Sequence, residues 1–156
     1  QMVYNHKPSQ YFHKYAFEKI KPLYPFGHGL SYSSFTYGTP RLAENNLENN
    51  GTVIFQIPVS NTSKLDGEEV VQLYIRDLYS SATRPVKELK AYERVFIKAG
   101  ETITVSFELS AESFAFYNRS MDYVVEPGVF RIMIGPSSKN KTLKTLNFKV
   151  NETITF

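Results

Sequence analysis

The stretch Thr102-Ile103-Thr104-Val105-Ser106-Phe107-Glu108-Leu109 alternates polar and apolar residues without a break. Successive side chains of a β-strand point to opposite faces, so the four apolar residues share one face and the polar residues share the other. This pattern predicts a strand with one face against a hydrophobic core and the other in water.

The same period of two recurs in four other stretches, which brings the clearly predicted strands to five. Their apolar positions are Val53, Phe55, Ile57 and Val59; Val71, Leu73 and Ile75; Phe130, Ile132 and Ile134; and Leu146, Phe148 and Val150. Two further strands are expected at 35–42 and 88–97. In the second of these, Tyr92 breaks the parity that Leu89, Val95 and Ile97 share, which a β-bulge or a second buried face would explain.

Turn-forming clusters separate the predicted strands. Lys98-Ala99-Gly100-Glu101 is typical of a hairpin connection, and the glycine of Glu126-Pro127-Gly128 is expected to supply the positive φ of a type II turn. Helical periodicity is nearly absent. About seven strands with turns between them predict an all-β fold, a two-sheet sandwich like those of immunoglobulin and fibronectin type III domains.

Composition limits the classes of function. The 156 residues suit one domain, and the absence of cysteine excludes disulfides and thiolate metal sites. Three scattered histidines do not suggest a metal cluster, so no cofactor is expected. The net charge is +3, but Lys and Arg are interspersed with Asp and Glu, and no apolar stretch is long enough to span a bilayer. Neither nucleic acid nor a membrane is therefore expected as a partner.

The beginning of the chain differs from the rest. The first 32 residues contain eight aromatic side chains but no alternation typical of a strand. We expect residues 1–22 to form an irregular arm, or the end of a preceding domain, and residues 23–156 to form the sandwich. The chain starts at Gln1 with no signal-like region after it, which favours a piece of a longer protein.

Two specific runs carry a family resemblance. The first is Tyr24-Pro25-Phe26-Gly27-His28-Gly29-Leu30-Ser31-Tyr32, and the second is Arg84-Pro85-Val86-Lys87-Glu88-Leu89-Lys90-Ala91-Tyr92-Glu93-Arg94-Val95. Shorter matches lie at 3–8, 67–75 and 125–135. Together they resemble the C-terminal fibronectin type III-like domain of glycoside hydrolase family three, the family of many β-glucosidases and β-xylosidases.

This resemblance implies a non-catalytic accessory domain that braces the catalytic domains of a larger enzyme, one that hydrolyses β-glucosides or β-xylosides. In the family the nucleophile is an aspartate of an N-terminal barrel domain, and the acid/base usually comes from the α/β domain that follows. This chain has no counterpart of either motif, so no catalytic residue is assigned. Because such enzymes act on plant or dietary oligosaccharides, the resemblance also implies a secreted or periplasmic protein.

Seven residues are candidates for contacts with other domains or with a sugar. They are Tyr11, Phe12, Tyr15, Phe26, His28, Arg84 and Glu88. Around His28, Gly27 and Gly29 would permit sharp bends or close backbone approach, and Phe26, Leu30 and Tyr32 are placed to pack on apolar surface. The alternative for His28 is a direct role as an acid, a base or a sugar-contacting group.

Arg84 and Glu88 are expected to form a buried or inter-domain ion pair. Glycoside hydrolysis needs a pair of carboxyl groups across a sugar site, but Glu88 and Glu93 lie among basic residues, which suits ion pairing better than acid catalysis.

Two other classes of function remain open. One is a stand-alone carbohydrate-binding sandwich that stacks sugars on Tyr11, Phe12 and Tyr15, although the chain has no Trp. The other is a protein-interaction module that self-associates through its exposed arm. Five Asn-x-Ser/Thr sites would also permit N-glycosylation in a eukaryotic secretory protein, at Asn50, Asn61, Asn118, Asn140 and Asn151.

Overall fold

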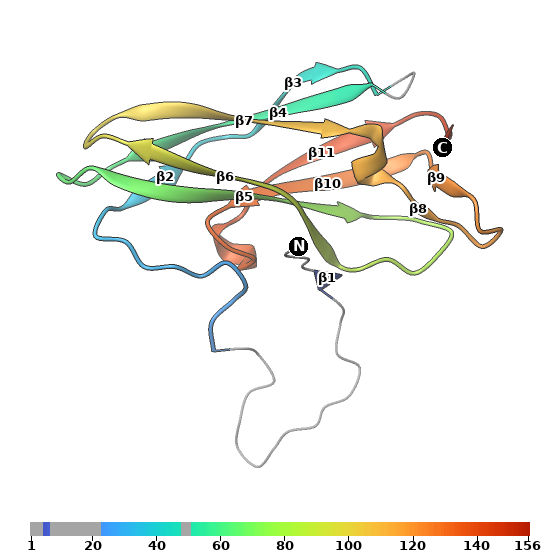
Figure 1. Cartoon of the computed structure of the whole chain (residues 1–156), viewed down its shortest axis with the longest axis horizontal. Coiled ribbons are helices and arrows are strands. Elements are labelled where there is room, and N and C mark those ends of the chain that lie inside the picture. The colour runs from blue at the N-terminus through green and yellow to red at the C-terminus, as the bar shows by residue number, and fades with distance from the viewer. Residues whose placement is uncertain (1–4, 7–22, 48–50) are drawn as a thin grey trace, which may run out of the picture.

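The computed structural model describes residues 5–6, 23–47 and 51–156, and for residues 5–6 only the backbone is considered. These residues form two packed β-sheets with a small third sheet at one end (Figure 1). The predicted all-β sandwich is therefore confirmed.

Sheet A has five antiparallel strands in the order β1-β6-β5-β10-β11. Their bounds are Asn5–His6 for β1, Gly67–Asp77 for β5, Lys87–Ile97 for β6, Gly128–Gly135 for β10 and Lys144–Val150 for β11.

Sheet B is built around β4, which pairs with β2, β3 and β7. Its strands are β2 (Phe35–Tyr37), β3 (Arg41–Asn45), β4 (Thr52–Asn61) and β7 (Thr102–Ser110). The small sheet contains β8 (Phe116–Tyr117), β9 (Tyr123–Val125) and β12 (Ile154–Thr155), and two 3-10 turns lie at Ala111–Phe114 and Asn140–Thr142.

The core lies between the inner faces of sheets A and B, where the predicted alternation places it. In β4 every second residue is buried, and Phe55 and Ile57 lie opposite Phe107 and Val105 of β7. Phe55 also meets Phe148 of sheet A edge to face, with ring centroids 5.6 Å apart. Burial of each such side chain contributes about 1.5–3 kcal/mol, so these positions define the sandwich.

The single strand expected at 35–42 is instead two short strands, because proline has no amide hydrogen for a sheet ladder. β2 ends at Tyr37 and β3 begins at Arg41, immediately after Pro40. In between, the Gly38 amide donates to the Pro58 carbonyl at 2.9 Å. Both strands lie along the edge of β4 that β7 leaves free.

The two predicted turns have different outcomes. At Lys98–Glu101 the Glu101 amide donates to the Lys98 carbonyl at 3.0 Å, and Gly100 has φ of 74°, so the hairpin connection is confirmed. The prediction of a type II turn at Gly128 is wrong, because the φ of Gly128 does not lie in the left-handed region. Gly128 instead begins β10 in extended conformation, opposite Val150.

The irregular parity of β6 has both of the causes considered for it. Leu73 of β5 pairs with Ala91, but the next residue, Tyr74, pairs with Leu89, so Lys90 is the extra residue of a bulge. Beyond the bulge Ala91 packs against the main core, whereas Leu89 turns to the outer face of sheet A. That face holds a second buried cluster of Tyr74, Met133 and Leu143.

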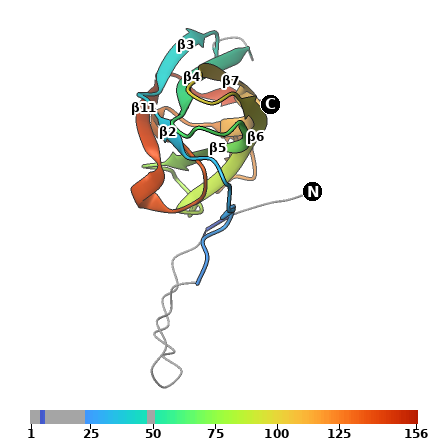
Figure 2. The same ribbon diagram turned by 90° about the vertical axis from the view of Figure 1, so that its left-hand side faces the viewer.

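The outer faces of the two sheets differ in character. On sheet B, Gln56 donates to Ser106, and Ser60 is hydrogen-bonded to Thr102, all of them on the exposed side of the strands. On sheet A, the second apolar cluster is partly covered by Phe26 from the segment that precedes β2. Seen along the strands, this segment runs on the side of sheet A that faces away from sheet B (Figure 2).

Candidate functional site

The residues Tyr24–Tyr32, named here the YPFGHGLSY segment, lie on the outer side of sheet A (Figure 1). The segment begins with a tight turn, in which the His28 amide donates to the Pro25 carbonyl at 3.0 Å and Gly27 has φ of 76°. A Cβ atom on Gly27 would lie only 2.1 Å from Gln72 Oε1. Both the turn and the close approach therefore require glycine.

Gln72 of β5 holds this turn against the sheet. Its side chain is 4% exposed, and its amide donates to the carbonyls of Gly27 at 3.3 Å and Pro136 at 2.7 Å. Its Oε1 accepts from the Tyr74 hydroxyl. The Ser138 amide also donates to the Phe26 carbonyl at 2.9 Å, so the first half of the segment is fixed by hydrogen bonds as well as by apolar packing.

A second anchor follows the segment. Ser33 is buried, and its hydroxyl lies 3.0 Å from the Leu65 carbonyl and 3.1 Å from that of Asp66. Gly67 lies beside it, and a Cβ atom there would come within 2.5 Å of Ser33 Oγ. The YPFGHGLSY segment is thus held at both ends.

Apart from Phe26, the large side chains of the segment are exposed. Tyr24 is 64%, Leu30 95% and Tyr32 99% exposed. His28 is exposed as well and stacks on Tyr24, with ring centroids 5.0 Å apart and planes 18° from parallel. The expectation that Phe26 packs on apolar surface is confirmed. Leu30 and Tyr32 are not buried against apolar surface among the described residues, and their packing on another domain stays a prediction.

A groove of about 500 Å³ runs between this segment and the outer face of sheet A. Apolar side chains line much of it, and the Gln72 amide contributes a polar group. The apolar lining comes from the segment, from β5 and β6, and from the end of β10, and it includes Phe26, Leu30, Val70, Leu89, Tyr92 and Pro136.

Arg84 and Glu88 form the ion pair that the sequence suggested, and it is buried within this domain. Arg84 Nη2 lies 3.0 Å from Glu88 Oε1, and Arg84 Nη1 lies 3.3 Å from Asp77 Oδ2. The guanidinium also donates to the Phe114 carbonyl at 2.9 Å and sits 4.8 Å from the centroid of the Phe116 ring. Burial raises the pKa of Asp77, and the charge of Arg84 partly opposes that rise.

Lys90 completes this cluster by contacting the second oxygen of Glu88 at 2.9 Å. Two acidic and two basic side chains therefore neutralise one another, and each carboxylate has a cationic partner. Such an arrangement connects strands and does not provide a free general acid. The inter-domain role of Arg84 and Glu88 stays a prediction.

Two further charged groups are partly or wholly removed from water. Glu69 accepts from the Tyr37 hydroxyl at 2.7 Å; burial raises the pKa of Glu69, and this hydrogen bond opposes the rise. Lys87 is 5% exposed and donates to Ser138 O at 2.6 Å and to Asn140 Oδ1 at 2.7 Å, and burial lowers the pKa of its amine.

Sequence reasoning missed Gln72, Ser33 and Lys87. A glutamine between apolar residues of an alternating strand indicates the solvent face, and Lys87 lies among charged residues that give no sign of burial. The one signal for Gln72 was its neighbour Tyr74, which places a large ring on that same supposedly polar face.

The described residues include no cluster of three or more His, Asp and Glu side chains suited to a metal ion. They also include no helix with the length and apolar content needed to cross a membrane. Among the glycosylation motifs, Asn61 is closed to modification in the folded chain, because its buried amide donates to the carbonyls of Leu65 and Ile97.

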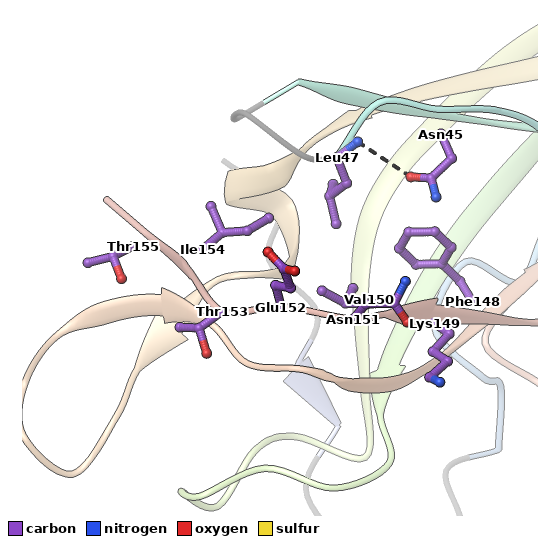
Figure 3. Close-up of a pocket in the computed structure, with 10 residues that line it drawn as sticks. All are labelled: Asn45, Leu47, Phe148, Lys149, Val150, Asn151, Glu152, Thr153, Ile154 and Thr155. Atoms are coloured by element: carbon purple, nitrogen blue, oxygen red, sulfur yellow. Dashed lines mark hydrogen bonds between the residues drawn. The ribbon is translucent and has the colours of Figure 1, made fainter.

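A second cavity, of about 370 Å³, lies at the other end of the molecule (Figure 3). It opens between the end of β3 and the segment that joins β11 to β12, with Leu47 and Phe148 among its apolar residues and Asn45, Asn151 and Glu152 among its polar ones. None of the predicted site residues in the described part of the chain lines it.

Tyr11, Phe12 and Tyr15 lie outside the described residues. The sugar-stacking platform and the self-associating arm therefore stay predictions.

Comparison with known proteins agrees with the observed fold. Residues 69–138 match the family described as Fibronectin type III-like domain. A β-xylosidase of Formosa agariphila is 47% identical over 88% of this chain and 19% of its own length, and a periplasmic β-glucosidase of Salmonella typhimurium is 43% identical over 85% and 17%. The crystal structure of a β-glucosidase from Listeria innocua in complex with glucose superimposes with a TM-score of 0.78 at 40% identity, covering 91% of this chain and 19% of that one.

The described residues thus define a two-sheet β-sandwich domain with a segment anchored on one outer face. The chain is a fibronectin type III-like domain of the kind found in family three β-glucosidases and β-xylosidases, as the sequence resemblance predicted. It spans about a fifth of the length of the curated relatives that it matches.

Proposed function

We propose that this chain is the non-catalytic, domain-bracing part of a larger β-glycosidase that hydrolyses β-glucosides or β-xylosides. The observation that carries the proposal is the extent of the match: relatives named as β-xylosidase and β-glucosidase align with 85–90% of this chain but only 17–19% of themselves. The larger remainder of such a polypeptide would hold the catalytic carboxylates.

The chemistry of the described residues supports this assignment. The buried carboxylates of Asp77 and Glu88 are neutralised by Arg84 and Lys90, and Glu69 is engaged by Tyr37. These engaged carboxylates do not provide the pair of carboxyl groups, set on either side of the scissile sugar bond, that a retaining or inverting glycosidase needs. The relative named as periplasmic supports a secreted or periplasmic location for the whole polypeptide.

The test is a hydrolysis assay with p-nitrophenyl β-glucoside and p-nitrophenyl β-xyloside, applied to the purified 156-residue chain and to the full-length polypeptide that contains it. We expect turnover by the full-length protein on at least one substrate and none by the chain alone at the same molar concentration. Hydrolysis by the isolated chain would refute the non-catalytic assignment, and inactivity of the full-length protein on both substrates would refute the β-glycosidase assignment.

A further inference from the structure

We propose that the outer face of sheet A and the YPFGHGLSY segment together form the docking surface for an apolar face of the remainder of the same polypeptide. This inference rests on the proposed function, because it takes the catalytic part of the enzyme as the occupant.

Exposed apolar side chains on sheet A are the first argument. Val70 of β5 lies opposite Arg94 of β6, and Tyr92 and Phe96, two residues to either side of Arg94, share its outer face. Their exposed fractions are 40% for Val70, 58% for Tyr92 and 57% for Phe96. Exposed apolar side chains gathered in this way around one ion pair on an outer sheet face are typical of an interaction surface.

The charges beside this patch do not indicate a polyanion as the partner. Arg94 forms an ion pair with Glu68 on the same face, so the two charges cancel and the patch has no row of unpaired basic side chains. A nucleic acid or an acidic membrane surface would require an excess of positive charge there. An apolar protein surface fits the observed chemistry better.

The anchored backbone of the segment is the second argument. Gln72 and Ser138 hold its first half, and Ser33 holds the chain just after it, while Leu30 and Tyr32 extend almost fully into solvent. Fixing a backbone costs conformational entropy, and the described fold offers no burial of these two side chains in return. Burial of Leu30 and Tyr32 against a second surface would offset this entropic cost. Because the backbone of the segment is already fixed, little further ordering would be needed on docking.

The groove beside the YPFGHGLSY segment also suits an apolar partner surface. Its volume of about 500 Å³ and the apolar side chains on its walls suit bulky apolar side chains projecting from the partner. Beside it, a Cβ atom on Gly29 would meet no described atom within 4 Å, which leaves the backbone open to close approach from outside.

The place where β1 joins the sandwich supports the remainder of the polypeptide as the occupant. β1 joins sheet A at the β6 edge, with Asn5 opposite Glu88 and His6 opposite Lys87, so the chain pairs with the same strand that carries Tyr92 and Phe96 (Figure 1). The curated relatives are about five times as long as this chain, so the polypeptide has ample material to cover it. Tethering raises the effective concentration of that material at the patch.

The experiment compares the same substitutions in two contexts, the isolated 156-residue chain and the full-length polypeptide. Tyr92→Asp and Leu30→Asp alter the docking surface. Tyr117→Asp, on the small sheet, is the matched control, since Tyr117 is 61% exposed and Tyr92 is 58% exposed. The melting temperature (Tm) of each variant is measured, and so is the oligomeric state of the isolated chain.

We expect Tyr92→Asp and Leu30→Asp to lower the Tm of the full-length protein by roughly 3 °C or more beyond their effect on the isolated chain. Tyr117→Asp should shift both contexts equally. Equal shifts for all three variants would overturn the proposal.

Two other outcomes identify a different occupant and also overturn it. If Tyr92→Asp and Leu30→Asp lower the Tm of the isolated chain as much as that of the full-length protein, this chain covers its own face. An isolated chain that dimerises, and becomes monomeric with Tyr92→Asp, would mean that a second copy does. Because Tm does not depend on turnover, failure of this test and failure of the hydrolysis assay are distinguishable.

Discussion

Gly27 shows how one residue joins the YPFGHGLSY segment to the sandwich. Its φ of 76° closes the turn from Pro25 to His28, and its missing side chain leaves room for the Gln72 amide. Gly27 therefore serves both the turn and the close packing against Gln72. Gly29, two residues later, has neither constraint within the described fold.

Three glycine substitutions separate strain from steric overlap. Gly27→Ala should destabilise the chain by more than about 1 kcal/mol, because alanine at positive φ is strained and its Cβ would displace Gln72. Gly100→Ala meets open space at φ of 74° and should show the backbone strain alone, and Gly29→Ala should be near neutral. Urea unfolding measures all three; a Gly27→Ala no more destabilising than Gly100→Ala would contradict the role given to Gln72.

Lys87 should make stability depend on pH. Burial lowers the pKa of its amine below the ordinary value of 10.5, so between the two pKa values the unfolded chain binds more protons than the folded chain. Linkage then makes the free energy of unfolding rise as pH increases through that window, and the penalty is fully present below it.

The measurement is urea unfolding of wild type and Lys87→Met from neutral to mildly alkaline pH. We expect the difference in stability between wild type and the variant to change with pH in favour of the wild type as pH rises. Lys98→Met, at an exposed turn position, is the control and should leave the pH dependence unchanged. A pH dependence in Lys87→Met identical to that of wild type would show that another group titrates.

At the scale of elements, β5 and β6 contribute to two buried faces and to a buried ion-pair cluster. The bulge at Lys90 turns Leu89 outward to the second apolar cluster while Ala91 keeps to the main core, so one strand serves two buried faces. The connection between the two strands carries Arg84 back over Asp77 and Glu88, and the same guanidinium reaches the 3-10 turn at Phe114. Arg84 therefore links both strands to the end of sheet B.

Removal of this link should be costly. Arg84→Met leaves Asp77 and Glu88 without their common partner in a buried site, and we expect a loss of about 3–5 kcal/mol in the free energy of unfolding. The matched control is Arg94→Met, whose side chain is 68% exposed beside Glu68 and which should cost at most about 1 kcal/mol. Equal effects in urea unfolding would show that the Arg84 cluster is not a structural link.

Across the described molecule the outer faces of the two sheets differ. Sheet B presents hydrogen-bonded Gln56, Ser60 and Thr102, whereas sheet A presents Val70, Tyr92 and a segment that holds apolar side chains out into solvent. A sandwich that acted alone would have little reason for this difference. For this reason we expect substitutions of Tyr92 and Leu30 to lower the Tm of the full-length protein more than that of the isolated chain.

Much of the fold could be predicted because alternation is a local signal. The strands around Val53–Val59 and Thr102–Leu109 follow from residues two apart that share a face, and the turn at Gly100 follows from its neighbours. The break at Pro40 is also a local signal, because a proline lacks the amide hydrogen that a strand needs. Gly128 failed because a Pro-Gly pair that usually makes a turn instead leads into a strand.

What the sequence determined by itself is the sandwich and its inward-facing core, because the period of two sets which side chains share a face without reference to distant residues. Only the tertiary structure decided that the other face of β5 is also covered. Gln72 and Tyr74 are buried there by a segment some 45 positions earlier in the chain and by β10 some 60 positions later, and no local pattern encodes such contacts. The same long-range packing decided which aromatic side chains of the YPFGHGLSY segment were left outside, and therefore where this domain is prepared to meet another surface.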